Sequence, residues 1–503
     1  MIYRSAIPTL DIPPVSLTEF VLTGARGRED KPAFIEAASG RTILFGELES
    51  RIRRFAGGLA AHGFGRGDVM ALYSYNTPEF MIAFHGAAWL GGTVTTINPA
   101  YTAEEIAKQL HDSRASILVC PADLVDRARE AANGTHIQQV LAFEEVEGDE
   151  ADTVGVEPHD VVALPYSSGT TGMPKGVMLT HSNLIANLLQ FESSGMATSE
   201  DVLLGVLPMF HIYGLVAIVN TGVYRGCTVV TMPRFELEQY LSHVEKYRVT
   251  VAHIVPPIVL ALAKHPVVDR YDTSALHTIF SGAAPLGREL CQAVAERLGV
   301  RIKQGYGMTE TSPATHISPV DDESDKHGSV GHLVAGTECR LVNTETGLDA
   351  KPGCDGEIWI RGPQVMRGYL NNPEATAATL DADGWLHTGD VAFRDEDGHF
   401  FIVDRVKELI KYKGFQVPPA ELEALLLTHP AVADAAVVGI PDDDAGELPR
   451  AFVVLRGEAS ADELKAHVAA HVAHYKRLHD VVFIDAIPKS PSGKILRRML
   501  KEI

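Results

Sequence analysis

Cysteine is scarce in this sequence, and the cysteines that are present are not paired. The 503 residues include five cysteines, and none of them belongs to a Cys-x-x-Cys motif. This pattern excludes a disulfide framework and a cysteine zinc site. Scattered single cysteines are typical of a reducing compartment, so we expect a cytoplasmic protein.

Long hydrophobic runs are missing as well. The most apolar internal stretch, residues 249–263, contains His253 and the pair Pro256-Pro257, and it is too short to span a bilayer. Residues 1–17 combine charged side chains with three prolines, unlike a signal peptide. The chain ends in Lys-Glu-Ile, which is not a peroxisomal signal. We therefore expect no transmembrane segment.

Positive charge is in deficit. The 44 Lys and Arg residues against 65 Asp and Glu residues give a net charge of -21 at pH 7. Phosphate backbones select basic surfaces, so we expect no nucleic-acid partner. An anionic small molecule such as a nucleotide remains compatible, because it responds to the local field of a cleft.

The length and the hydrophobic pattern predict several α/β units. Apolar residues at 46% and charged residues at 22% are ordinary values for a globular protein, and 503 residues exceed the size of one domain. Strand-like runs alternate with helical periodicity, which predicts parallel strands covered by helices. The expected elements are a helix at 46–61, a strand at 69–73, a helix at 78–90, a strand at 93–97, a helix at 103–111 and a strand at 116–119.

A second alternation predicts a binding pocket. A strand at 278–280, a helix stopped by Gly299 and a strand at 300–303 form a candidate βαβ unit. In a right-handed unit, the loops 281–285 and 304–310 both leave the carboxyl edge of one sheet, where open α/β sheets bind ligands. We expect the two loops to share a pocket.

The last third of the chain changes character. Short β runs split by Gly and Pro at 336–361 indicate a small β-rich subdomain. A compact α+β unit of domain size follows the polar segment Asp404-Arg405-Val406-Lys407. We therefore expect an N-terminal domain at 1–403, a hinge at 404–407 and a C-terminal domain at 408–503.

A loop rich in Gly, Ser and Thr carries the sharpest local signal. Residues 166–176 read Tyr-Ser-Ser-Gly-Thr-Thr-Gly-Met-Pro-Lys-Gly, in which glycines let backbone N–H groups approach phosphate and the lysine supplies charge. Pro174 and Gly176 break the Walker A pattern. A strand at 176–179 indicates that the loop joins two strands rather than opening a helix. A flexible surface turn is the alternative.

Six further motifs follow this loop in order along the chain. They are Leu207–Gly214, Ser281–Pro285, Gln304–Glu310, Trp385–Asp390, Asp404–Val417 and Pro491–Lys494. Together with the loop they closely resemble the AMP-forming adenylate-forming enzymes, most of all the 4-coumarate–CoA ligase branch of acyl-CoA synthetases. The resemblance implies a large N-terminal domain of doubly wound α/β subdomains with a small β-rich subdomain, and a small mobile α+β C-terminal domain.

The resemblance also implies the reaction. A carboxylic acid and ATP, with Mg²⁺, give acyl-AMP and pyrophosphate, and CoA then gives acyl-CoA and AMP. A hydroxycinnamate or similar aryl acid is the expected substrate, and a medium- or long-chain fatty acid is the alternative. A non-catalytic nucleotide sensor on the same fold is a further alternative, separated by a test for pyrophosphate release. We expect a monomer or a homodimer.

The resemblance assigns the nucleotide site residue by residue. Tyr306 can stack on the adenine ring, Asp390 can accept both ribose hydroxyls with Arg405 beside it, and Glu310 offers a hard oxygen to Mg²⁺. The assigned ATP and AMP ligands are Ser167, Ser168, Gly169, Thr170, Thr171, Gly172, Lys175, Ala283, Ala284, Pro285, Gln304, Gly305, Tyr306, Thr309, Asp390, Arg405 and Lys494.

Four residues are assigned to the chemical steps by the same resemblance. Lys494 is the cation that bridges the substrate carboxylate and the α-phosphate, where negative charge grows. Thr309 and Glu310 contact the phosphate and the metal ion. His211 can change its charge near neutral pH, but we favour a gate between the acyl site and the thiol tunnel over a general base.

The acyl and CoA sites are the last to be assigned. The expected acyl pocket consists of Ile212, Tyr213, Ala217, Phe280, Ala283, Gly305, Gly307, Pro313, Ala314, Lys411 and Gln416. Most of these side chains are small and leave room for a ring or a chain. Arg234, Lys413 and Gly414 are the expected CoA contacts, and Lys407 is the expected hinge residue.

Overall fold

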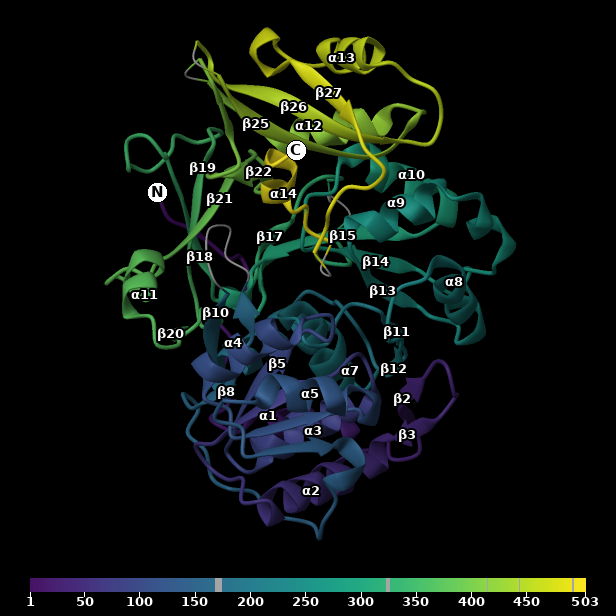
Figure 1. Ribbon diagram of the computed structural model, residues 1–503, viewed down its shortest axis with the longest axis vertical. Helices are drawn as coiled ribbons and strands as arrows, with labels where there is room; N and C mark the ends of the chain where they lie inside the picture. The colour runs from purple at the N-terminus through teal and green to yellow at the C-terminus, as the bar shows by residue number, and fades with distance from the viewer. Residues whose placement is uncertain (168–173, 323–325, 414, 443, 491–492) are drawn as a thin grey trace.

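The computed structural model describes residues 1–167, 174–322, 326–413, 415–442, 444–490 and 493–503 (Figure 1). The expected contacts Ser168, Gly169, Thr170, Thr171, Gly172 and Gly414 lie outside these residues. No helix in the described part of the chain is long and apolar enough to cross a membrane.

The first large sheet contains the predicted βαβα alternation. Its strands run in the order β20-β10-β8-β5-β4-β6-β7, and the five strands from β8 to β7 are parallel to one another, whereas β10 is antiparallel to β8. The bounds are β4 Val69–Tyr73, β5 Thr93–Ile97, β6 Ile117–Cys120, β7 Gln139–Ala142, β8 Val161–Ala163, β9 Tyr166–Ser167, β10 Lys175–Thr180, β20 Gly368–Tyr369, α2 Phe45–Ala61, α3 Pro78–Trp89, α4 Ala103–Ser113 and α5 Val125–Ala132.

Strand β4 shows how helices come to cover both faces of this sheet. Met70 and Leu72 belong to the main core, which includes apolar residues of α2 and α3. Ala71 and Tyr73 belong to a second core with residues of α4 and α5. Successive side chains of a strand point to opposite faces, so an almost wholly apolar strand must be covered on both. This is the doubly wound arrangement that was predicted.

The second large sheet carries the predicted pocket-forming unit. Its strands run in the order β17-β16-β15-β14-β13-β11-β12-β2-β3, and β14 and β15 are parallel neighbours joined through α10. The bounds are β2 Pro32–Glu36, β3 Thr42–Leu44, β11 Val202–Gly205, β12 Thr228–Thr231, β13 Val251–Ile254, β14 Thr278–Ser281, β15 Arg301–Gly307, β16 Ala314–Ile317, β17 His332–Leu333, α8 Leu237–Lys246, α9 Pro256–Lys264 and α10 Arg288–Leu298.

Strand β15 is longer than the predicted strand at 300–303. It continues to Gly307, because Gly305, Tyr306 and Gly307 pair with the antiparallel strand β16. A Cβ added to Gly307 would lie 1.9 Å from the carbonyl oxygen of Pro313. Only glycine allows the two backbones to approach so closely. The first half of the motif 304–310 is therefore strand rather than loop.

The β-rich subdomain is larger than residues 336–361. Its antiparallel sheet has the order β1-β18-β19-β21-β22 and recruits the N-terminus of the chain. The bounds are β1 Tyr3–Arg4, β18 Glu338–Val342, β19 Gly356–Arg361, β21 Leu386–Arg394 and β22 Phe400–Arg405. Asp404 and Arg405, from the expected hinge, are thus paired in this sheet.

The C-terminal α+β unit has a core of its own, formed by residues between Ile410 and Val481. Its bounds are β23 Ile410–Tyr412, β24 Phe415–Val417, β25 Val432–Asp442, β26 Gly446–Leu455, β27 Asp480–Phe483, α12 Pro419–Thr428, α13 Ala461–Ala469 and α14 Arg497–Lys501. Helix α13 ends at Ala469. Beyond it Tyr475 stacks on Phe415, with ring centroids 4.5 Å apart, and the chain leaves the helix axis.

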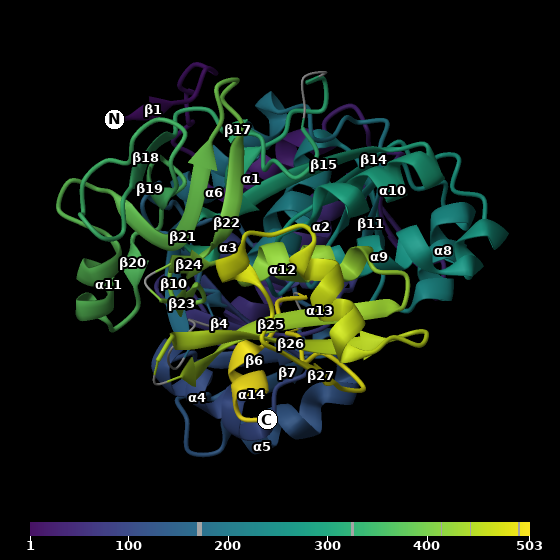
Figure 2. The same cartoon turned by 90° about the horizontal axis from the view of Figure 1, so that it is seen from above.

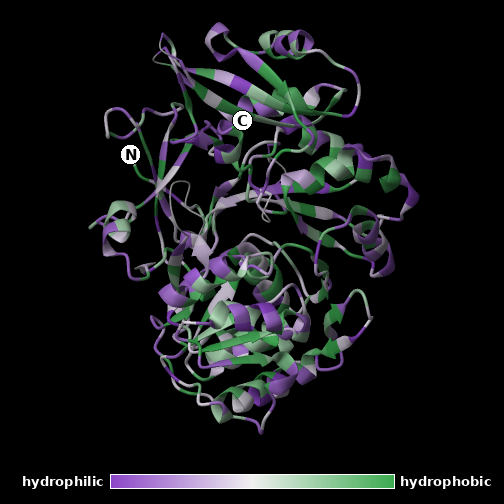
Figure 3. Ribbon diagram, viewed as in Figure 1, coloured by the Kyte–Doolittle hydropathy of each residue, from purple (hydrophilic) through white to green (hydrophobic). Residues whose placement is uncertain are grey.

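The described residues also form four further α-helices, several short 3-10 helices and a π-helix at Gly214–Asn220. The four α-helices are α1 Leu17–Leu22, α6 His181–Ser193, α7 Thr221–Arg225 and α11 Pro373–Thr379. Hydrophobic residues are concentrated on the central strands of the sheets, as Figure 3 shows.

The C-terminal unit lies across the top of the N-terminal part in Figure 1, and Figure 2 shows the same arrangement from above. Lys264 donates to the carbonyl oxygen of Leu427 at 2.6 Å, and the backbone N–H of Ala420 donates to Asp404 at 2.9 Å. At the edge of the β-rich subdomain, burial raises the pKa of Asp355, Lys476 of the C-terminal unit lowers it, and Glu421 raises it. The neighbouring Cys354 is exposed, whereas the other four cysteines are buried.

Candidate active site

The loop at 166–176 joins two strands, as predicted. Tyr166 and Ser167 in β9 pair with Gly176 and Lys175 in the antiparallel strand β10. Tyr166 also donates to Asp112 at 2.7 Å, which holds the first strand of the hairpin against the end of α4. Ser167 and Lys175 therefore stand at the two ends of the loop.

Glu310 lies at the meeting point of three elements. It belongs to a single 3-10 turn, Thr309–Thr311, that follows β15. Its Oε1 accepts a hydrogen bond from Ser167 at 3.0 Å and another from Tyr369 at 2.8 Å. Lys175 lies 4.6 Å above the Tyr369 ring. The structure thus brings Ser167, Lys175 and Glu310 together, and it adds Tyr369, which the sequence motifs did not single out.

A second polar group bridges the nine-stranded sheet and the β-rich sheet. The hydroxyl of Tyr306 in β15 donates to Oδ2 of Asp390 at 2.6 Å. Nε of Arg405 lies 3.1 Å from Oδ1 of the same carboxylate, because Asp390 in β21 and Arg405 in β22 are cross-strand partners. Asp390 is thus a strand residue, and only 5% of it is exposed.

Burial and charge act against each other on these groups. Burial raises the pKa of Asp390, while Arg405, the Tyr306 hydrogen bond and Lys494 lower it. Burial and the adjacent carboxylate Asp390 also raise the pKa of the Tyr306 phenol well above its usual value. Tyr306 is therefore an uncharged hydrogen-bond donor at neutral pH.

Lys494 reaches this group from the C-terminal unit. Burial lowers the pKa of Lys494, Arg405 lowers it further, and Asp390 and Glu310 oppose both effects. His211 is also close, since burial and then Lys494 lower its pKa to about 3. His211 is thus neutral through the physiological range, which disfavours a charged role. A residue from the end of the chain completes a cationic site between the two sheets.

Comparison with known proteins identifies the family to which the chain belongs. The family model of the AMP-binding enzymes matches residues 22–370, and the model of their C-terminal domain matches residues 421–494. The chain belongs to the AMP-binding enzymes. The expected family and class, an AMP-forming acid–CoA ligase, are confirmed, and so is the expected α/β fold.

The chain is similar both to curated relatives and to solved structures. It is 45% identical to 4-coumarate-CoA ligase 1 of Narcissus pseudonarcissus, over 99% of this chain and 96% of the relative. It is 45% identical to the 4-coumarate–CoA ligase of Pinus taeda, over 99% and 97%. An anthranilate CoA ligase in complex with anthranoyl-AMP has a TM-score of 0.91 at 25% identity, covering 98% of each chain. A benzoate CoA ligase from Burkholderia xenovorans has a TM-score of 0.88 at 27% identity, covering 97% and 99%.

A wall of aromatic rings is built on β13 and β14 of this AMP-binding enzyme. Phe280 at the end of β14 stacks on His253 of β13, with ring centroids 5.2 Å apart and an interplanar angle of 10°. Tyr213 meets the His253 ring edge-on at 5.9 Å, and its hydroxyl lies 3.4 Å from Nδ1. The predicted pocket residues Ile212, which directly precedes Tyr213, and Ala217, which lies on the π-helix, are both buried.

His253 is a member of this wall that the motifs did not reveal. The only signal in the sequence was one histidine in an otherwise apolar strand. Burial lowers the pKa of His253 to about 4, so the imidazole is neutral. Its Nε2 is buried without a hydrogen-bond partner among the described residues. A buried, unsatisfied polar atom costs about 1–3 kcal/mol, which a ligand could recover.

The backbone around the wall is shaped by close contacts. Ala283 adopts a left-handed conformation with φ +70°, and a Cβ on Gly282 would lie 3.2 Å from the Tyr213 ring. This turn places Ala283, Ala284 and Pro285 after the end of β14. Gln304, Gly305 and Gly307 follow on the adjacent strand β15, and Gly307 pairs with Ala314 beyond Pro313.

The remaining predicted residues are not brought to the site. Lys411 and Gln416 are exposed partners on the hairpin β23–β24, and Lys413 is exposed at its turn with φ +48°. Arg234 is exposed after β12. Lys407 lies in the turn between β22 and β23. Among the described residues of the C-terminal unit that were predicted for the site, Lys494 is the one whose pKa responds to Asp390 and Glu310.

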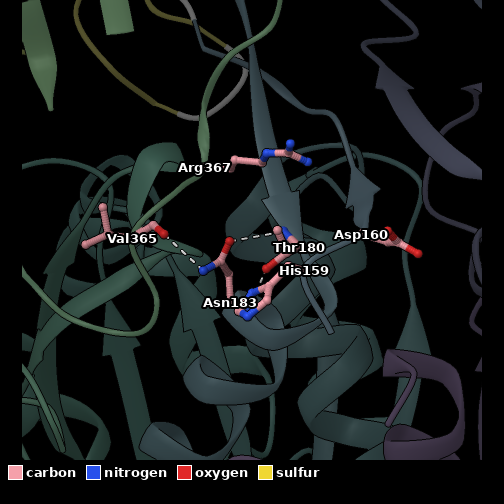
Figure 4. A pocket seen from close by; sticks show the side chains of 6 residues that line it. All are labelled: His159, Asp160, Thr180, Asn183, Val365 and Arg367. Carbon is pink, nitrogen blue, oxygen red and sulfur yellow. Dashed lines mark hydrogen bonds between the residues drawn. The ribbon is translucent and has the colours of Figure 1, made fainter. Parts of the chain in front are cut away.

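A separate surface pocket of about 510 Å³ lies at the N-terminus of α6 (Figure 4). Asn183 accepts a hydrogen bond from the backbone N–H of Thr180 at 3.0 Å and donates to the carbonyl oxygen of Val365 at 2.9 Å. These bonds make Asn183 a capping and connecting residue. The pocket contains none of the predicted site residues.

Proposed function

We propose that this acid–CoA ligase activates a hydroxycinnamate or a similar aryl acid. One carboxylate oxygen attacks the α-phosphorus of ATP, and the bond to pyrophosphate breaks, which gives acyl-AMP. The thiol of CoA then attacks the acyl carbon, and AMP leaves with the bonding electron pair. The observation that supports this proposal is the electrostatic coupling of Lys494 to Arg405, Asp390 and Glu310, which influence its pKa.

Lys494 supplies the electrostatic requirement of the first step. Two anions, the carboxylate and the α-phosphate, have to approach each other, and negative charge grows on phosphorus. A fixed cation in a site screened from water stabilises that charge more strongly than it could in bulk water. Asp390 accepts the ribose hydroxyls, and Tyr306 provides an aromatic face for adenine.

The residues around Glu310 fit a magnesium ion. The Glu310 carboxylate accepts two hydrogen bonds from described residues, Ser167 and Tyr369, and both are made to Oε1. Its Oε2 can therefore offer a hard carboxylate oxygen, and Mg²⁺ is commonly held by one or two carboxylates together with substrate phosphates. The ion would neutralise phosphate charge while Thr309 binds the α-phosphate.

The second step requires a different face of the C-terminal unit. We place the domains at 1–403 and 408–503, with Lys407 as the hinge that absorbs the backbone change. Rotation would withdraw Lys494 and bring Lys411, Lys413, Gly414 and Gln416 to the acyl site, with Arg234 contacting a CoA phosphate. Lys411, Lys413 and Gln416 are exposed here, as expected of a face that docks only in the other conformation.

The aromatic wall supports an aryl acid. Phe280, His253 and Tyr213 present flat faces and edges to a ring, and aromatic pairs gain about 0.5–1.5 kcal/mol beyond the area they bury. The unsatisfied Nε2 of His253 can bond a phenolic hydroxyl group. A fatty acid would satisfy neither feature.

Pyrophosphate release tests the proposal. The enzyme is mixed with MgATP, CoA and one acid from a set of cinnamates, benzoates and fatty acids of graded length. We expect kcat/KM to be highest for 4-coumarate, lower for cinnamate and lowest for the fatty acids. A maximum at a medium- or long-chain fatty acid would replace the aryl assignment with the fatty-acid alternative and leave the ligase class intact.

A further inference from the structure

Three metal-ligating side chains meet at a distance from the nucleotide site. His332 is the first residue of β17, His399 directly precedes β22, and Asp322 lies in the segment after β16. Nitrogen or oxygen atoms of the three side chains all lie within 4.8 Å of one another. The residues are far apart in the sequence, so the fold itself assembles the group.

The separations match the edges of a metal coordination polyhedron. Oδ2 of Asp322 lies 3.2 Å from Nε2 of His332 and 3.7 Å from Nε2 of His399. Zinc binds imidazole nitrogen and carboxylate oxygen at about 2.0–2.2 Å, so two ligands of a tetrahedral ion are about 3.4 Å apart. One ion can therefore contact all three atoms with small adjustments of the side chains.

The second ring nitrogen of His332 fixes its orientation. Nδ1 lies 3.2 Å from the carbonyl oxygen of Gly398, a pure acceptor, so Nδ1 carries the proton and donates. Nε2, the other ring nitrogen, lies 3.2 Å from Oδ2 of Asp322 and so points at the carboxylate that would share the ion. Metal-bound histidines typically donate their other N–H to a backbone carbonyl or a carboxylate in this way.

His399 gives an independent reason to expect a ligand. Its side chain is only 1% exposed, and neither ring nitrogen has a hydrogen-bond partner among the described residues. Asp322 and Asp395 lie 3.7 and 3.9 Å from its two nitrogens, beyond hydrogen-bond length. A buried polar group of this kind is expected to have a partner.

We propose that Asp322, His332 and His399 bind one Zn²⁺-like divalent cation, with water completing the coordination. Imidazole and carboxylate ligands suit zinc and its neighbours, whereas Mg²⁺ prefers oxygen ligands only. The site is thus chemically distinct from that at Glu310. It is structural, because it contains none of the residues assigned to the substrates.

The position of the ion explains what it would stabilise. His332 pairs with Ile317 of β16, and β16 pairs with Tyr306 of β15. His399 directly precedes strand β22, which ends at Arg405. The ion would therefore fasten the nine-stranded sheet to the β-rich sheet at one end of their contact, while the Tyr306–Asp390–Arg405 group joins them at the other.

Metal titration of the full chain tests the proposal. The protein is stripped with a chelator, dialysed and titrated with Co²⁺ as a spectroscopic probe, and Zn²⁺ is added in a parallel thermal unfolding series. We expect about one equivalent of Co²⁺ to bind with a tetrahedral absorption spectrum, and Zn²⁺ to raise Tm. His332→Gln should weaken Co²⁺ binding by at least ~10-fold, since this ligand fixes the site.

His111→Gln is the matched control, because His111 is exposed and its ring contact is His136 rather than a carboxylate. It should bind Co²⁺ like the wild type. If His399→Gln does not fold, Asp322→Asn and His332→Gln decide the question, because both side chains are partly exposed. Absence of saturable Co²⁺ binding, or unchanged binding in His332→Gln, overturns the proposal. So would a His332 proton titration with a raised pKa in protein that binds no metal, since it indicates a simple His–Asp ion pair.

Discussion

Asp390 has structural contacts besides its proposed role in nucleotide binding. Its buried carboxylate accepts a hydrogen bond from Tyr306 and pairs with the partly exposed Arg405, so its removal leaves both groups without this partner. Asp390→Ala is therefore a poor probe of ATP binding, because it changes these contacts as well. Asp390→Asn keeps the shape and one acceptor oxygen.

We expect Asp390→Asn to raise the KM for ATP by at least ~10-fold while the KM for the acid changes little. The reason is that an amide oxygen accepts ribose hydroxyls less strongly than a carboxylate. Steady-state kinetics with each substrate varied separately measure the effect, and thermal unfolding controls for the fold. An unchanged KM for ATP in a folded variant would remove Asp390 from the nucleotide site.

His253 decides how finely the acyl wall can discriminate. We expect His253→Leu to lower kcat/KM for 4-coumarate by ~10-fold and to leave cinnamate, which lacks the hydroxyl group, nearly unchanged. A neutral hydrogen bond contributes about 0.5–1.5 kcal/mol, which sets that magnitude. The ratio of the two kcat/KM values is the measurement. Phe280→Leu is the control, because it alters the ring stack without touching Nε2; equal losses for both acids in His253→Leu would refute the hydroxyl contact.

At the scale of elements, our proposal assigns the segment around Lys494 to the first half-reaction and the turn at Lys407 to the second. Lys494→Ala should reduce acyl-AMP formation by ~10²–10³-fold, as expected when one preorganised electrostatic group is lost. The same variant should convert supplied acyl-AMP and CoA to thioester at nearly the wild-type rate. Separate assays of the two half-reactions measure this. An equal loss of both steps would contradict the alternation of the C-terminal unit.

Lys407→Pro is the complementary variant. Proline fixes φ, so a hinge at this position could not rotate. We expect acyl-AMP to accumulate while thioester formation stalls. If Lys407→Pro completes both half-reactions at the wild-type rate, another residue of the segment is the hinge.

The elements also show how far the sequence predicts this structure. Strand β5 lies at the predicted residues, and helix α10 ends at the predicted Gly299, because periodicity and a left-handed glycine are local signals. The extension of β15 to Gly307 was not predictable, since it depends on pairing with β16. The ordered motifs singled out Tyr306, Asp390 and Lys494 as candidate site residues. They did not single out His253 and Tyr369, because only the folded chain shows which residues lie beside these two.

At the scale of the whole molecule, a carboxylate sits where the two domains meet. Asp404 accepts the backbone N–H of Ala420 at the start of α12. Burial raises the pKa of Asp404 to about 7, although Arg497 opposes this effect. Arg497 is already paired with Glu408 and Glu423, so the charge of this one cation is shared among three carboxylates. The weakened compensation favours the protonated form of Asp404.

The pH dependence of stability follows from this raised pKa. Between pH 3.8 and about 7 the native protein holds a proton on Asp404 that the unfolded chain releases, so stability falls as the pH rises through this window. One pKa unit corresponds to about 1.4 kcal/mol. Asp404→Asn should therefore abolish a pH-dependent decrease in the free energy of unfolding on the order of 2–4 kcal/mol. Thermal unfolding of both proteins from pH 5 to pH 8 measures it. The exposed Asp30→Asn is the control, and parallel profiles for the wild type and Asp404→Asn would contradict the assignment.

Cys354 gives the molecule a built-in attachment point for a dye. It is the one exposed thiol of the five, and the residue after it, Asp355, senses Lys476 and Glu421 across the domain boundary. A thiol-reactive fluorophore would therefore label the native chain once, without engineered substitutions, at a position whose surroundings the proposed rotation of the C-terminal unit would change. Its brightness would follow that rotation during single turnovers, in the same cuvette in which pyrophosphate is released.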